Sequence, residues 1–68
     1  MKHTIKIFHK ENTKVNNTYT AHFSNVTDAY NEYLDCISVL RNTDRLTGTY
    51  FVCRYNGNDL MAIEEIKG

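Results

Sequence analysis

The chain of 68 residues has no proline and only three glycines. It also lacks internal repeats and low-complexity segments, so nothing marks a linker between domains. We therefore expect one domain over residues 1–68. A chain this short buries only about 60% of the surface that its unfolded form exposes. That predicts a thin core. Pairing of the chain with a second copy or with a partner would therefore be unsurprising.

Long apolar runs are absent as well. No run approaches the roughly 18 residues that a membrane-spanning helix needs. The opening stretch "MKHTIKIFHK" also lacks the long apolar segment and the cleavage site of a signal peptide. We therefore expect a cytoplasmic protein that makes no membrane contact.

The chain has no net charge at pH 7, which argues against binding to nucleic acid or membranes by bulk attraction. Its charges are unevenly spread, however. Residues 1–24 carry four lysines and one glutamate, whereas the charges of residues 25–40 are three acids. A basic segment is thus followed by an acidic one, and each is a candidate contact surface.

Two segments near the start, residues 3–10 and 18–24, alternate apolar and polar side chains as half-buried strands do. Pairing Ile5 with Phe23 and Ile7 with Ala21 places both apolar rows on one face, with residues 10–17 as a polar connection. The other face then carries these side chains: Lys6, Phe8, Lys10, Thr18, Thr20 and His22.

From Val26 the apolar period becomes that of a helix, which we predict from Val26 to Arg41. Asn25 is suited to cap its start, Asp28 complements the positive helix end, and Asn42 is suited to a left-handed exit. The predicted core face of this helix comprises Val26, Ala29, Tyr30, Tyr33, Cys36, Ile37 and Leu40.

Residues 47–68 are predicted to form a hairpin that turns on Asn56-Gly57, since these residues tolerate the positive φ angles of a type I′ turn. In that register Arg54 faces Asp59. The face expected against the helix consists of Phe51, Cys53, Leu60, Ala62 and Ile66. The face expected to stay open, together with Phe8, consists of Tyr50, Val52, Met61 and Ile63, and it is either a dimer or partner interface or a patch covered by strand ends.

The element order predicts an α+β protein of ββαββ topology, with a four-stranded, mostly antiparallel sheet and one helix packed on one face. The pattern offers little for catalysis. His3, His9 and His22 are not at metal-ligand spacing, and we expect His9 and His22 on opposite faces of the sheet. Cys36 and Cys53 form no Cys-X-X-Cys pair, so we interpret them as small buried hydrophobes. We expect no enzyme activity, no metal and no cofactor.

Three acids, Asp28, Glu32 and Asp35, follow one another at i, i+4 and i+7 on the predicted helix. Like charges at i, i+4 cost a few tenths of a kcal/mol, and only Asp28 is explained by the helix start. The remaining pair is either a solvated helix face or a row of carboxylates that engages a basic surface.

A very short, Asn-, Thr- and Tyr-rich chain with this acidic helix beside a small sheet resembles the small phage-encoded inhibitors of bacterial defence systems, anti-CRISPR proteins among them. The resemblance covers overall size and the stretch Asp28 to Asp35, and it carries no motif. It implies an inhibitor that occupies a basic, nucleic-acid-binding surface of a larger host protein or complex. Unlike the strongly acidic DNA mimics, this chain is neutral, which favours a local patch. The predicted partner-binding residues are Asp28, Glu32, Asp35, Tyr50, Met61 and Ile63.

The alternative prediction is a small nucleic-acid-binding regulator that uses the outer face of the first hairpin. Cations there would follow phosphates while aromatic rings stack on bases. Lysines on a strand can also serve only to discourage the addition of further strands. The residues of this alternative are Lys2, Lys6, Phe8, Lys10 and His22.

Overall fold

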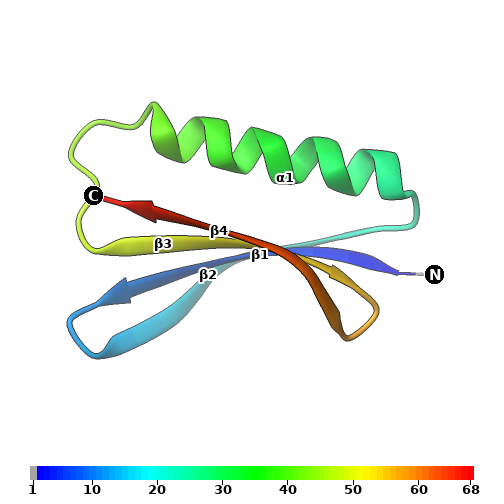
Figure 1. The fold of residues 1–68 in the computed structure, drawn as a ribbon, viewed down its shortest axis with the longest axis horizontal. Coiled ribbons are helices and arrows are strands. Elements are labelled where there is room, and N and C mark those ends of the chain that lie inside the picture. The colour runs from blue at the N-terminus through cyan, green and yellow to red at the C-terminus, as the bar shows by residue number, and fades with distance from the viewer. Residues whose placement is uncertain (1) are drawn as a thin grey trace.

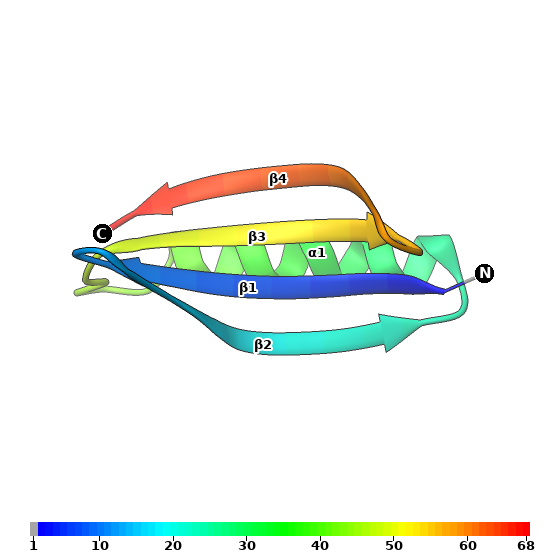
Figure 2. The ribbon, with the colours of Figure 1, turned by 90° about the horizontal axis from the view of Figure 1, so that it is seen from below.

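The computed structural model describes residues 2–68 and shows two β-hairpins joined by one helix (Figure 1). The elements are β1 (His3–Glu11), β2 (Lys14–Phe23), α1 (Val26–Arg41), β3 (Thr49–Asn56) and β4 (Asp59–Lys67). All neighbouring strands pair antiparallel, in the order β2-β1-β3-β4. Figure 2 shows β1 and β3 running along α1, with β2 and β4 on the flanks. The predicted ββαββ fold is confirmed.

Helix α1 has the predicted bounds, Val26–Arg41. The Asn25 side chain caps it, since its Oδ1 accepts hydrogen bonds from the backbone N–H groups of Thr27 at 2.7 Å and Asp28 at 3.3 Å. The predicted left-handed exit at Asn42 is wrong, because Asn42 has a φ of −96° and its N–H bonds back to Ser38. In the connection to β3, positive φ angles occur later, at Arg45 and Gly48.

The first hairpin is longer than predicted. Its strands continue through the expected polar connection to a two-residue turn, in which Asn12 has a φ of 59°. Ile5 therefore pairs with Ala21, and Ile7 with Tyr19, followed by a bulge. This register differs from the predicted one by two residues. A shift of two keeps every side chain on its face, so the apolar row of β1 still faces the helix.

The second hairpin turns on Gly57-Asn58, not on Asn56-Gly57, because Asn56 pairs with Asp59. Gly57 has a φ of 61° and Asn58 has no positive φ, which fits the first central position of a type II′ turn. A bulge follows, in which Met61 is the extra residue of β4. The position of the turn and the bulge together give β3 and β4 a different register from the predicted one.

The faces predicted for β3 are wrong. Val52 pairs with Ile7 of β1, and cross-strand partners share a face, so Val52 lies against the helix. Tyr50 is on the helix side too, whereas Phe51 and Cys53 point to the other side. Pairing with β1 fixes this orientation, and the sequence pattern of β3, which is apolar on both faces, does not reveal it.

The core is small, as predicted. It consists of Ile5, Ala29, Tyr33, Val52 and Ile66, with half-buried apolar side chains around them. Val26, the first residue of α1, and Tyr30, at one edge of the predicted helix face, are 52% and 48% exposed, so the prediction that they belong to the core is wrong. In the described part of the chain, no helix is both long and apolar enough to span a membrane.

Candidate functional site

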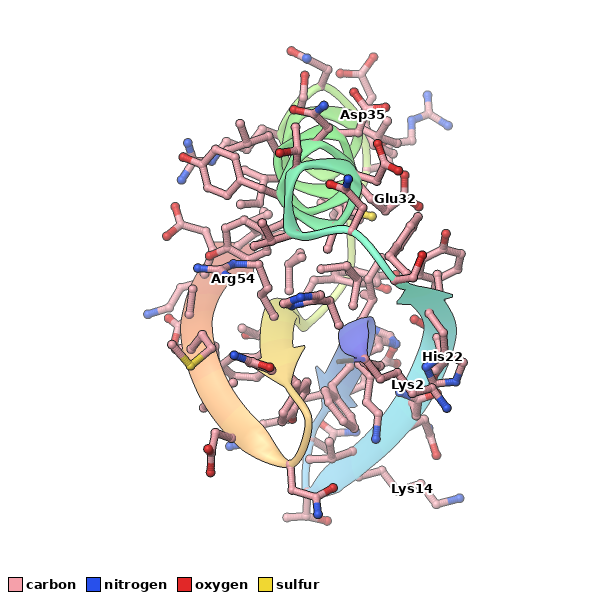
Figure 3. All side chains as sticks on the ribbon, turned by 90° about the vertical axis from the view of Figure 1, so that its right-hand side faces the viewer. Lys2, Lys14, His22, Glu32, Asp35 and Arg54 are labelled. Carbon is pink, nitrogen blue, oxygen red and sulfur yellow. The ribbon has the colours of Figure 1, made fainter. Side chains whose placement is uncertain are left out.

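The acidic row of α1 lies on the side of the helix above the edge strand β2. Figure 3 shows Glu32 and Asp35 on this side. Asp28 and Asp35 are exposed, and no salt bridge within residues 2–68 involves an acid of this row. The carboxylates of Asp28 and Asp35 are therefore available to an outside cation.

Glu32 has a structural partner that the sequence did not indicate. The Tyr19 phenol on β2 donates a hydrogen bond to a carboxylate oxygen of Glu32. This bond, together with burial and the negative charge of Glu32, raises the pKa of Tyr19 to about 12. The phenol therefore keeps its proton to a higher pH than an ordinary tyrosine does, and its hydrogen bond orients the Glu32 carboxylate.

A groove between α1 and β2 is lined in part by Glu32 and Asp35. It has a volume of about 260 Å³, and we call it the acidic groove. Its lining residues are Ile7, Tyr19, Glu32, Asp35, Cys36, Val39 and Leu40. Ile7, Cys36 and Leu40 are half-buried in it, whereas Val39 is 65% exposed. The groove thus combines an apolar lining with two carboxylates.

The other predicted partner residues do not form one surface with the acidic row. Tyr50 lies on the helix side of the sheet and stacks on His9, with ring centroids 4.3 Å apart. Met61, in the bulge, and Ile63 are each 53% exposed. Ile63 lies on the side away from the helix, as predicted, because it pairs with Cys53. The predicted patch of Tyr50, Met61 and Ile63 is therefore divided.

Arg54 does not face Asp59 as predicted, because Asp59 pairs with Asn56 beside the turn, and the bulge then brings Ala62 opposite Arg54. Its guanidinium lies 5.8 Å from the centre of the Tyr30 ring, on the helix side of the sheet (Figure 3). Arg54 is consequently on the opposite face of the sheet from Lys6, a residue of the nucleic-acid prediction.

The side of the sheet away from α1, which we call the open face, brings together three residues of the nucleic-acid prediction. Lys2, Lys6 and His22 line a hollow of about 360 Å³. Its other lining residues are Thr4, Tyr55, Gly57 and Asn58. The Lys6 Nζ lies 5.4 Å from the centre of the Tyr55 ring. Tyr55 was missed because the two faces of β3 were assigned the wrong way round, which only its pairing with β1 reveals.

Phe8 and Lys10 lie farther along the open face, on the same strand as Lys6. Phe8 is paired with Phe51 of β3, which sequence reasoning had assigned to the helix side. Both rings are half-buried, and Lys10 is exposed. The open face therefore offers a basic hollow at one end and a pair of aromatic rings beyond it.

His9 and His22 lie on opposite faces, as predicted, because His9 stacks on Tyr50 whereas the Nδ1 of His22 lies 3.0 Å from the hydroxyl of Thr4. Burial raises the pKa of both cysteine thiols, which lowers the fraction of thiolate at neutral pH. Within residues 2–68, no three or more His, Cys, Asp or Glu side chains form a group that could hold a metal ion.

Comparison with known proteins finds no protein-family model, no curated protein and no solved structure that matches this chain.

Proposed function

We propose that this chain is a non-enzymatic binding protein that occupies a basic surface of a larger protein through its acidic groove. In the most concrete form of the proposal, it is an inhibitor encoded by a phage or mobile element. Its target would then be a bacterial defence or nucleic-acid-processing protein whose basic surface serves to bind nucleic acid.

The observation that carries the proposal is the position of Glu32 and Asp35 beside an apolar groove. An arginine or lysine can lay its aliphatic stem on apolar groups while its charged end meets a carboxylate. Val39 and Leu40 supply the apolar surface, and Asp35 supplies a carboxylate that has no salt bridge within residues 2–68. Cations on a nucleic-acid-binding surface would fit this arrangement.

The hydrogen bond from Tyr19 supports the same proposal, because it fixes the Glu32 carboxylate before any partner arrives. A group that is already ordered loses less side-chain entropy on binding. Tyr19 uses one oxygen of the carboxylate, and a carboxylate has about four lone-pair sites in all. Glu32 can therefore accept a further hydrogen bond from a partner cation.

The chain has no net charge, so any attraction to the partner is local. At physiological ionic strength, charges more than about 8 Å apart are largely screened. The charge pairs would thus act at close range and fix the orientation of the complex, while apolar burial in the groove supplies affinity.

The test begins with a tagged form of the intact protein, used to capture a partner from bacterial lysates. The affinity of the purified partner is then measured for the original chain and for the double variant Glu32→Lys, Asp35→Lys. We expect a loss of tenfold or more, because like charges would meet at the interface.

The control is Asp44→Lys, which makes one such acid-to-lysine substitution at an exposed site outside the groove. It should bind nearly as the original chain does, and circular dichroism checks that each variant is folded. Unchanged affinity of the double variant would exclude the acidic groove as the contact surface.

A further inference from the structure

The hollow on the open face gathers positive charge without a compensating acid. Lys2, Lys6 and His22 contribute to its lining, and no Asp or Glu does. Neither lysine takes part in a salt bridge within residues 2–68. The lysine ammonium groups supply several hydrogen-bond donors, and Thr4 and Tyr55 complete the lining. Such a surface is complementary to an anion with several acceptor oxygens, such as a phosphate group.

The position of Lys6 argues against a role limited to keeping further strands from adding to the sheet edge. Lysines that discourage the addition of further strands belong on edge strands. Lys6 lies on β1, which is a central strand between β2 and β3. Lys6 as a residue is half-buried, and its ammonium group lies over the Tyr55 ring. Edge protection therefore does not account for it.

Acids elsewhere on the open face do not neutralise the hollow. Glu65 is opposite Phe51, far along β4 from the hollow, and its carboxylate lies 3.4 Å from the Lys67 ammonium. Lys10 adds a further exposed cation on β1. The open face therefore has an excess of positive charge although the whole chain is neutral.

Aromatic rings continue the surface beyond the hollow. Tyr55 pairs with Thr4, and Phe51 pairs with Phe8 four residues farther along the strands. At about 3.3 Å per residue, this places the Phe8 and Phe51 pair roughly 13 Å from Tyr55. A flexible polyanion lying along β1 and β3 could thus contact both the hollow and the rings.

We infer that the open face binds single-stranded nucleic acid. Phosphates occupy the hollow beside Lys2, Lys6 and His22, and unstacked bases lie on the rings of Tyr55, Phe8 and Phe51. Base stacking on aromatic rings requires bases that are not enclosed in a duplex. An acidic or phosphorylated peptide could use the charges, but it has no comparable need of the rings. This site shares no residue with the acidic groove.

The experiment measures fluorescence anisotropy of labelled single-stranded DNA and RNA with the intact protein, first at low salt and then over a salt titration. We expect binding whose logarithmic affinity falls with the logarithm of salt concentration. Lys6→Ala should reduce that slope by about 0.7, the value for one phosphate contact on a single strand. Lys14→Ala is the matched control, because Lys14 lies outside the hollow (Figure 3), and it should leave the slope unchanged.

The rings are tested separately. Tyr55→Leu should weaken binding about fivefold or more, the effect of losing one stacked base. Phe8→Leu is a second ring variant in case the first does not fold, and circular dichroism identifies any variant that has unfolded. A duplex of the same sequence should bind more weakly than the single strand.

Several results would overturn the inference. These are no binding at low salt, equal binding of duplex and single strand, and equal competition by a polyglutamate peptide. A sedimentation mass of a dimer that Ile63→Lys reduces to a monomer would show that a second copy covers the open face, and would also overturn it. The double variant Glu32→Lys, Asp35→Lys should keep its nucleic-acid binding, so this inference and the proposed function can fail independently.

Discussion

The phenol of Tyr19, on the edge strand β2, donates a hydrogen bond to the carboxylate of Glu32 on α1. This contact ties the edge strand to the helix, and it raises the pKa of Tyr19 to about 12. The pKa of a tyrosine in an unfolded chain is about 10. Because the folded pKa is the higher one, the contribution to stability is fully present below about pH 10 and is lost as the pH rises through about 12.

The first prediction concerns Tyr19→Phe. The free energy of unfolding in urea should fall less steeply between about pH 10 and pH 12 in this variant than in the original chain, because one late-titrating phenol is gone. The pKa values of Tyr33 and Tyr55 are raised too, in their case mainly by burial. Both residues are present in the variant and in the original chain, so their contributions to the pH dependence cancel in the comparison.

Glu32→Gln provides the matched control for this prediction. It removes the negative charge that raises the pKa of Tyr19 but keeps the phenol, so its profile should also be flatter than that of the original chain. If both variants retain the full alkaline loss of stability, the hydrogen bond does not link the strand to the helix in solution.

The contact of Tyr19 with Glu32 also marks where sequence reasoning stopped. Local rules relate residues three or four positions apart on a helix, and they indicated the bounds of α1 and its cap. Tyr19 and Glu32 are 13 positions apart on different elements. Glu32 therefore looked unexplained in the sequence, although it has a partner in the fold.

The faces of β3 were unpredictable for a related reason. Val52 and Tyr50 are apolar or aromatic, but so are Phe51 and Cys53 on the other face. Alternation can assign a face only when the two faces differ in polarity. The pairing of Val52 with Ile7 determines which face of β3 meets the helix, and this pairing is a long-range property of the whole sheet. The acidic row, by contrast, lies on one helix and could be read from its spacing.

A second prediction tests this assignment of faces. Val52→Thr places a hydroxyl where the side chain is fully buried, which should lower the free energy of unfolding by about 1–3 kcal/mol. Ile63→Thr makes a similar change at an exposed position, and it should stay within about 0.5 kcal/mol. Urea unfolding followed by circular dichroism measures both. A loss for Val52→Thr no larger than that for Ile63→Thr would contradict the burial of Val52 against the helix, and would favour the open position that the sequence suggested for it.

A third prediction concerns the helix cap. Asn25→Ala removes the acceptor for the backbone N–H groups of Thr27 and Asp28, and it should cost about 0.5–2 kcal/mol. Asn31→Ala is the control, because Asn31 is exposed within α1. It should be neutral or slightly stabilising, since alanine has the higher helix propensity. Equal effects of the two variants on urea unfolding would contradict a capping role for Asn25.

The last prediction uses the cysteines to report on the acidic groove. Cys53 is 3% exposed, whereas Cys36 is half-buried in the groove lining. Burial is the main cause of the raised pKa of both thiols, so each should react more slowly with a chromogenic disulfide reagent at pH 8 than it does after unfolding. Cys36 should react before Cys53, and Cys36→Ser should remove the earlier phase.

A protein partner bound in the acidic groove should slow the earlier phase without changing the later one. Single-stranded nucleic acid on the open face should leave the earlier phase unchanged, because Cys36 lies on the helix side of the sheet. The rate of the earlier phase therefore distinguishes a ligand bound in the acidic groove from one bound on the open face. If the bound partner leaves the reaction of Cys36 unaffected, the acidic groove is not where that partner binds.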